Sequence, residues 1–188
     1  AITPEKLYYY MDMMDRNTSR LLNLINNIID NKKIENGSYI LTKEETDIVY
    51  LVEETVMDMK EYIEGKGIEF IFDTDIEEKT VNCDKTEIER CIVNLVSNAV
   101  KFTPEGGLIE VTVSDLDDKV KISVKDSGIG ISEENKKSIF DRFNQVVDKS
   151  SELKGGSGLG LTICNQLITL HGGDIYVESE VGVGSRSE

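Results

Sequence analysis

The sequence has little positive charge, and this scarcity excludes partners that need it. Its 188 residues include 21 lysines and arginines against 36 aspartates and glutamates, for a formal net charge of −15. Non-specific nucleic-acid binding and docking on an anionic membrane surface both need clustered basic side chains. We therefore expect no nucleic-acid partner and no membrane contact by this chain. Any polyanionic ligand must be held by local dipoles and a few placed cations.

Long apolar runs and metal-type cysteine patterns are also missing. No stretch approaches the length of a membrane span and no leader pattern is present, so we expect nothing to insert or be exported, although an anchor could lie outside this chain. Cys83, Cys91 and Cys164 have neither CxxC nor Cys/His spacing. This pattern favours reduced thiols buried in a cytosolic core, and hence a cytoplasmic location.

The first 35 residues have the pattern of one long helix with a narrow apolar seam. Pro4 suits the first turn of a helix, and Gly37 suits its end. Apolar residues recur in steps of four and three, which is a heptad pattern: Leu7, Met11, Met14, Leu21, Ile25 and Ile28. Since nothing later in the chain offers a comparable partner helix, we expect another chain or segment to cover this seam.

The rest of the chain mixes helices and strands without a regular βαβ repeat. Helices are predicted from a cap at Thr46 or Asp47 to residue 64 and from a cap at Asp84 to residue 102, and then at 132–139 and 161–170. The predicted strands are 39–41, 68–73, 80–83, 108–114, 119–125 and 174–178. This order favours an α+β fold, a two-layer α/β sandwich with a mixed sheet covered by helices on one face, preceded by the long coiled-coil-type helix.

Asn94, Asn98 and Lys101 share one face of the predicted helix that follows Asp84. Two amides and an ammonium group in this arrangement could hold a hydrated Mg²⁺ and the oxygens of a polyphosphate, because Mg²⁺ keeps several waters and takes few protein oxygens. A plain solvated face is the alternative. Asparagine is a poor helix former, however, and its double appearance needs a reason.

Two glycine-containing segments could bring backbone close to a ligand. Asp126-Ser127-Gly128-Ile129-Gly130-Ile131 leaves a predicted strand, and its glycines lack the Cβ atoms that would hold a flat ring away from the main chain. The cluster Gly155-Gly156-Ser157-Gly158-Leu159-Gly160 precedes a helix and leaves N–H groups free for an anion, although it is not a Walker A loop. An ordinary strand-end turn and a flexible linker are the respective alternatives.

These motifs, together with Phe140-Asp141-Arg142-Phe143, occur in the order and spacing of one family. The chain resembles the ATP-binding catalytic domain of sensor histidine kinases, within the wider gyrase, heat-shock chaperone and mismatch-repair ATPase group. The match covers roughly residue 39 to the C-terminus. The first helix looks like the second helix of the family's dimerisation and phosphotransfer hairpin. The resemblance therefore implies two domains, residues 1–37 and 38–188.

The resemblance implies ATP and Mg²⁺ as cofactors and a role for each matching residue. Asp126 would accept a hydrogen bond from the adenine amine, and Asn98 would ligate Mg²⁺. Asn94 and Lys101 would contact the phosphate chain as the catalytic residues, and Phe102 would pack near the base. Residues 144–154 would form a lid. The other implied nucleotide contacts are Gly128, Gly130, Ile131, Phe143, Gly156, Ser157, Gly158, Leu159, Gly160 and Leu161.

The implied activity is transfer of the ATP γ-phosphoryl group to a histidine. Hydrolysing relatives carry a glutamate at the position of Asn94, and an amide cannot act as that base, so gyrase-like hydrolysis is disfavoured. The only histidine, His171, lacks the His-Glu or His-Asp context of a phosphoacceptor, and its imidazole can cap carbonyls or pack at a helix end. We expect the chain to bind ATP without phosphorylating itself. A non-catalytic ATP/ADP-binding module is the alternative.

The resemblance also implies partners and two departures from the family pattern. The full protein would form a homodimer through the N-terminal helix region and would act on a response regulator receiver domain. Gln145 stands where many members carry an arginine that reaches the γ-phosphate. Residues 182–188 stop where relatives continue into a final strand, so we expect that strand to be truncated and a sheet edge to be unpaired or missing.

Overall fold

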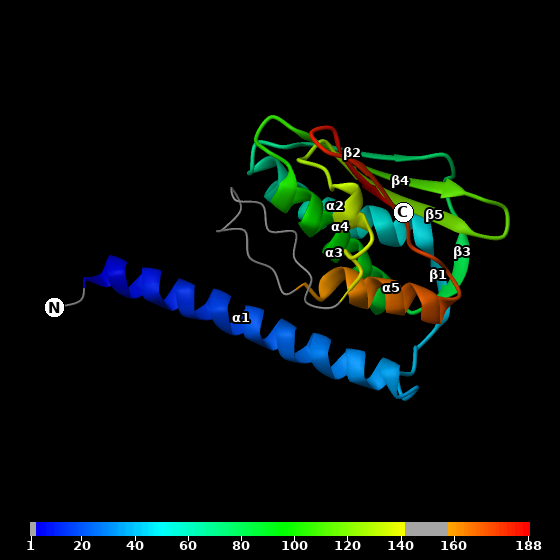
Figure 1. Cartoon of the computed structure of the whole chain (residues 1–188), viewed down its shortest axis with the longest axis horizontal. Helices are drawn as coiled ribbons and strands as arrows, with labels where there is room; N and C mark the ends of the chain where they lie inside the picture. Colours follow the sequence, from blue (N-terminus) through cyan, green and yellow to red (C-terminus); the bar gives the residue numbers. More distant parts are fainter. Residues whose placement is uncertain (1–2, 142–157) are drawn as a thin grey trace. The chain divides into compact units, whose positions relative to one another are not determined.

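The structure is a computed structural model that describes residues 3–141 and 158–188. The chain divides into two compact units, residues 1–39 and 40–188, and Figure 1 labels most of their elements. Within the described residues, no helix combines the length and the apolar character needed to cross a membrane. The assignment of the first unit to a phosphotransfer hairpin stays a prediction.

The first unit is the predicted long helix, α1 (Pro4–Glu35). Thr3 caps its start by accepting a hydrogen bond from the Lys6 N–H, and Pro4 lies in the first turn, where a missing N–H costs nothing. Its apolar seam is exposed, with Met14 at 68% of its full accessible surface. The heptad pattern has therefore produced the helix, and its apolar side chains are left open to solvent.

The second unit is built on a five-stranded sheet in the order β2-β4-β5-β7-β6. Only β2 and β4 pair in parallel, which gives the mixed sheet that the sequence predicts. A separate antiparallel pair joins β1 to β3. The strands are β1 (Glu44–Asp47), β2 (Glu69–Thr74), β3 (Thr80–Cys83), β4 (Leu108–Asp115), β5 (Val120–Asp126), β6 (Val177–Glu180) and β7 (Gly184–Ser187).

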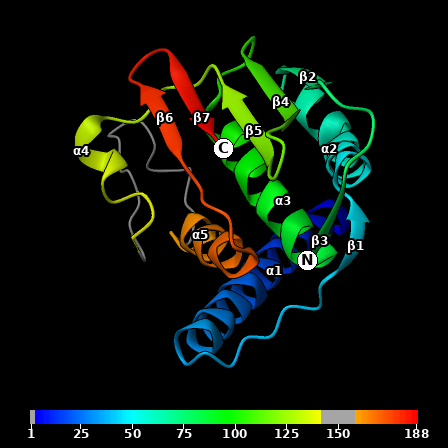
Figure 2. The ribbon, with the colours of Figure 1, turned by 90° about the vertical axis from the view of Figure 1, so that its right-hand side faces the viewer.

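Helices cover one face of this sheet, as Figure 2 shows for α2, α3 and α5. Of the two candidates predicted to cap α2, Asp47 is the cap and accepts the Val49 N–H at 3.1 Å. The predicted cap of α3 is confirmed, because Asp84 accepts the Glu87 N–H at 3.3 Å. Such a cap contributes roughly 0.5–2 kcal/mol. The helices of this unit are α2 (Ile48–Glu64), α3 (Lys85–Phe102), α4 (Glu133–Lys136) and α5 (Gly160–His171).

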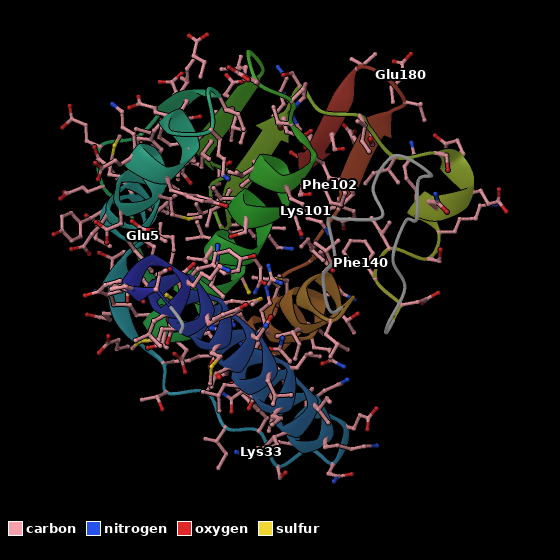
Figure 3. All side chains as sticks on the ribbon, turned by 90° about the vertical axis from the view of Figure 1, so that its left-hand side faces the viewer. Glu5, Lys33, Lys101, Phe102, Phe140 and Glu180 are labelled. Carbon is pink, nitrogen blue, oxygen red and sulfur yellow. The ribbon has the colours of Figure 1, made fainter. Side chains whose placement is uncertain are left out.

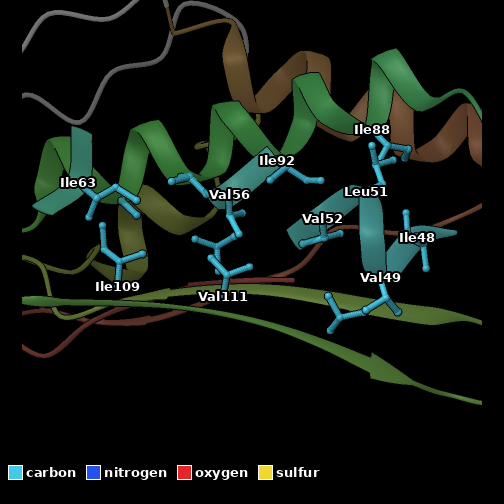
Figure 4. Packing of buried hydrophobic residues seen from close by; sticks show 14 of the residues in the cluster. Ile48, Val49, Leu51, Val52, Val56, Ile63, Ile88, Ile92, Ile109 and Val111 are labelled. Atoms are coloured by element: carbon cyan, nitrogen blue, oxygen red, sulfur yellow. The ribbon is translucent and has the colours of Figure 1, made fainter. Parts of the chain in front are cut away.

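The core lies between the sheet and helices α2 and α3. Alternate residues of β4 are fully buried, and their side chains meet the apolar faces of the two helices (Figure 4). Each such side chain contributes roughly 1.5–3 kcal/mol when it is buried. The central members are Val52, Val56, Ile63, Ile88, Ile92, Val96, Ile109, Val111 and Val113. This core fixes α3 against the sheet and so fixes the direction of its polar face.

Several predicted elements differ in position from the structure. The helix predicted at 132–139 is the shorter α4 (Glu133–Lys136), and the strand predicted at 174–178 is β6 (Val177–Glu180). Residues 39–41 form no strand, and Ile40 is 86% exposed; the strand is β1, because its partner β3 lies opposite residues 44–47. Residues 182–188 were expected to leave a sheet edge unpaired, but they contain β7, which pairs with both β5 and β6. The pattern Gly-Ser-Arg-Ser has low strand propensity, and tertiary pairing overrides it. Whether the final strand is truncated stays a prediction.

Candidate nucleotide-binding site

The turn at residues 126–131 begins where β5 ends and is hydrogen-bonded to β4 and to the end of α3. Asp126 Oδ1 accepts the Gly128 N–H at 2.8 Å. Ser127 exchanges two hydrogen bonds with Leu108 at the start of β4, at 2.8 and 3.0 Å. The Ile129 N–H points to the Phe102 carbonyl, 3.4 Å away at the end of α3. Asp126 is thereby placed beside the helix that carries the asparagines.

Asp126 is the titratable group of this turn with a perturbed pKa. Burial raises the pKa of its carboxyl above the ordinary value, while hydrogen bonds from the backbone amides of Gly128 and Ser185 oppose the rise. A half-buried carboxylate held by two amides is a directed hydrogen-bond acceptor. Asp126 also lines a hollow of about 530 Å³ between α4 and the β6–β7 hairpin, together with Lys136, Ser179 and Arg186.

The two glycines of the turn are required for a different reason from the predicted one. A Cβ at Gly128 would lie 2.5 Å from Asp126 Oδ1 and 2.7 Å from the Phe102 carbonyl oxygen. Gly130 has φ +70°, and its Cβ would lie 2.0 Å from the Glu180 carbonyl oxygen. The absence of a Cβ at these positions predicts room for a ligand ring. The protein's own backbone occupies it, so the glycines are needed first for the fold.

The predicted polar stripe lies on α3 as expected. Asn94, Asn98 and Lys101 are all half-buried, and Lys101 Nζ lies 4.6 Å from the centre of the Phe102 ring. Figure 3 labels these last two residues at the end of the helix. Asn94 Nδ2 donates to the Arg90 carbonyl at 2.9 Å. Within the described residues, the side-chain amide of Asn98 makes no hydrogen bond.

The start of α5 meets the stripe at Asn94. A Cβ at Gly160 would lie only 2.9 Å from Asn94 Oδ1, so the glycine permits close approach of the two helices. Leu159 precedes α5 with a fully buried side chain and provides no side-chain cap. The N–H groups at the start of a helix can bind an anion. The structure thus brings Asn94 and Gly160 together, although it does not test their predicted roles.

Several predicted site residues lie outside the described residues. They include Phe143, Gly156 and Ser157, the residue Gln145, and the whole predicted lid at 144–154. Gly158 is described and has φ +67°, a conformation that favours glycine. Leu161 lies in the first turn of α5 and is half-buried.

Helix α5 is fixed along α3 by two further contacts that sequence reasoning did not locate. Cys164 Sγ lies 3.9 Å from the Cys91 carbonyl oxygen, and a hydrogen bond with Cys164 and burial raise the pKa of the Cys91 thiol. At the other end, His171 Nε2 accepts the Asp84 N–H at 3.0 Å, and Nδ1 lies 2.7 Å from the Leu167 carbonyl oxygen. His171 therefore caps and packs, as its helix-end position indicated. Local sequence gives no signal for its partner Asp84.

Comparison with known proteins identifies this arrangement. Residues 83–188 match the family of histidine kinase-, DNA gyrase B- and HSP90-like ATPases. The chain belongs to this family. The predicted fold and the predicted histidine-kinase-type ATP-binding catalytic domain are thereby confirmed.

Individual relatives from this family are histidine kinases. The chain is 34% identical, over 90% of its length, to histidine kinase P4 of Formosa agariphila, of which it spans 13%. All of the chain and 38% of full-length ShkA in complex with AMPPNP superimpose at TM-score 0.82 and 28% identity. The histidine kinase ThkA, solved in complex with the response regulator protein TrrA, gives TM-score 0.73 and 31% identity over 98% of this chain and 51% of that one. The chain thus spans less than two thirds of each of these proteins.

Proposed function

We propose that this chain is the catalytic part of a two-component sensor histidine kinase, which transfers the ATP γ-phosphoryl group to a histidine outside the chain. The observation that carries this proposal is the contact between Asn94 on α3 and Gly160 at the start of α5. An amide faces the helix start at the place where hydrolysing relatives have a carboxylate. Because an amide cannot take a proton from water, transfer is favoured over hydrolysis.

The base of ATP would be selected by Asp126. Its carboxylate is half-buried and already oriented by the Gly128 and Ser185 amides. Adenine presents an amine that donates to a carboxylate, whereas guanine presents an oxygen at that position and would leave two acceptors facing each other. A hydrogen bond to a charged group contributes roughly 1.5–3 kcal/mol, and a mispaired one costs more. The ShkA complex with AMPPNP supports an adenine nucleotide as ligand.

The phosphate chain and Mg²⁺ would be held at the other end of the site. The half-buried Asn98 amide, which has no hydrogen bond within the described residues, fits an ion that takes few protein oxygens and completes its shell with phosphate and water. Bound there, Mg²⁺ would offset negative charge on the transferring group. Lys101 and the N-terminal end of α5 would contribute the remaining positive potential in a chain of net charge −15.

The acceptor histidine and the partners would come from outside this chain. Both ring nitrogens of His171 are engaged, one with the Asp84 amide and one with the Leu167 carbonyl, which disfavours an acceptor role. The exposed seam of α1 supports homodimerisation through this region in the full protein. The ThkA–TrrA complex supports a response regulator receiver domain as the downstream partner. We place this part of the protein in the cytoplasm.

Titration calorimetry of ATP binding, with and without Mg²⁺, tests the site. We expect Asp126→Asn and Asn98→Ala each to weaken binding by about tenfold or more, because each removes a contact to a charged group. Asn98→Ala should also remove the effect of Mg²⁺. Matched controls are Asp73→Asn and Asn82→Ala, which change exposed residues on β2 and β3. Unchanged ATP affinity in Asp126→Asn would contradict the assignment of the base.

Phosphate transfer in trans tests the reaction. The chain is mixed with radiolabelled ATP and a separate segment that carries the first hairpin helix and its histidine. We expect acid-labile label on that segment and none on the chain alone. Phosphohistidine on the chain alone would contradict the proposed acceptor. ATP binding without transfer would favour a non-catalytic nucleotide module, and steady turnover near ~1 s⁻¹ would favour a gyrase-like ATPase.

A further inference from the structure

The β6–β7 hairpin and the turn at 126–131 are interlocked through main-chain contacts. The Gly182 N–H donates to the Ile129 carbonyl at 2.8 Å. A Cβ at Gly130 would lie 2.0 Å from the Glu180 carbonyl oxygen, and a Cβ at Gly184 would lie 1.9 Å from the Asp126 carbonyl oxygen. Each segment therefore presents a glycine where the other's backbone passes. The turn cannot move without moving the hairpin.

The side-chain hydroxyl of Ser179 on β6 adds hydrogen bonds to this main-chain contact. Its Oγ accepts the Ile131 N–H at 2.7 Å, at the point where the turn ends. The same Oγ lies 2.8 Å from the Gly184 carbonyl oxygen and 3.0 Å from Ser185 Oγ. The hydroxyl proton is thus donated to the Gly184 carbonyl while the oxygen accepts. A half-buried hydroxyl that both donates and accepts in this way fixes the spacing between its partners.

Asp126 depends on the same two segments. Its carboxylate accepts the Gly128 N–H in the turn at 2.8 Å, and the Ser185 amide of β7, which lies opposite Asp126 in the sheet, acts on the same carboxylate. Ser179 joins these segments at Ile131 and Gly184, so it holds together the two donors that aim the carboxylate. Lys136 of α4 reinforces the position by donating to the Ser179 carbonyl at 2.7 Å.

We propose that Ser179 is a positioning residue for adenine recognition, which acts by keeping the turn and β7 at the spacing that orients Asp126. The proposal rests on the proposed function. Without the hydroxyl, the Ile131 N–H and the Gly184 carbonyl lose their partner, and the turn samples orientations in which Asp126 does not meet the base. The apparent affinity for the nucleotide is the intrinsic affinity multiplied by the fraction of molecules in the competent orientation, so it falls as that fraction falls. Contacts to the phosphate chain on α3 and α5 are unaffected.

The test compares Ser179→Ala with Thr74→Val in the full chain. Thr74 is the matched control because its half-buried Oγ1 also donates to a backbone carbonyl and accepts a backbone N–H, both of Ile76, but at the opposite edge of the sheet. Affinities for ADP and GDP are measured for each variant. We expect Ser179→Ala to lose about tenfold in ADP affinity and to reduce the preference for ADP over GDP, while Thr74→Val keeps both.

Two further measurements separate positioning from a general loss of stability. In a double-mutant cycle with Asp126→Asn, the two losses should be less than additive, because Ser179 acts through Asp126. Ser179→Thr, which keeps the hydroxyl, should restore base preference. Full additivity, or equal loss of ADP affinity in Thr74→Val, would overturn the proposal.

Amide hydrogen exchange gives a readout that needs no nucleotide. Ser179→Ala should speed exchange at Ile131 and Gly128, and Thr74→Val should not. If the parent chain binds no adenine nucleotide, the proposed function fails, and the spacing role of Ser179 is still decided by this exchange. If the parent binds ADP and Ser179→Ala matches it in affinity, preference and exchange, only the role of Ser179 fails.

Discussion

The turn at 126–131 is held by backbone contacts, whereas the stripe on α3 presents side chains. At the turn, Gly128 and Gly130 face carbonyl oxygens of α3 and β6 at distances that leave no room for a Cβ. On α3, Asn98 and Lys101 project from a helix whose opposite face is already fixed by the core. The backbone contacts that form the base end of the proposed site therefore also stabilise the fold. The phosphate end can be altered with little effect on folding.

The largest expected effect is the destabilisation caused by Gly130→Ala. The added Cβ would lie 2.0 Å from the Glu180 carbonyl oxygen at φ +70°, so the turn and the hairpin must separate. We expect a loss of about 3 kcal/mol or more in the free energy of unfolding, measured with urea. The control is Gly182→Ala, with φ +81° and nothing within 4 Å, which should cost only about 1–2 kcal/mol. Equal losses would mean that the turn is not locked by contact.

A smaller effect is expected for His171→Ala at the far end of α5. The change leaves the Asp84 N–H and the Leu167 carbonyl without their imidazole partner. We expect the free energy of unfolding to fall by about 1–3 kcal/mol. Thr169→Ala on the same helix is the control, because it removes an exposed hydroxyl bonded only within the helix, and should change stability by less than about 0.5 kcal/mol. If His171→Ala lowers the free energy of unfolding no more than Thr169→Ala does, the His171 contact does not hold α5 to α3.

The smallest effect is a pH dependence of stability that arises at Asp126, at the base end. Burial raises the pKa of Asp126, so the folded state holds its proton more tightly than the unfolded state does. Its contribution to the free energy of unfolding therefore falls as pH rises above the ordinary carboxyl pKa. Asp126→Asn removes this cost, and its stability relative to the parent should rise between acid and neutral pH. A difference between Asp126→Asn and the parent that stays flat with pH would contradict the prediction.

Elements with a strong local pattern were predictable. The heptad pattern gives α1, the aspartates at 47 and 84 give the starts of α2 and α3, and alternation gives β4 and β5. The elements that were missed depend on distant partners. Strand β1 exists because β3 pairs with it, and β7 because it fits between β5 and β6. A glycine- and serine-rich strand has almost no local signal.

The sequence alone determined which side chains share a face and which residue ends a strand. Asn94, Asn98 and Lys101 had to lie on one side of α3 because helical spacing is local, and Asp126 had to stand where the apolar alternation ends. Only the tertiary structure decided why Gly128 and Gly130 are glycines, and it alone placed Ser179 and His171 against their partners. Those contacts join segments far apart in the chain, and their geometry exists only once the sheet and helices have packed.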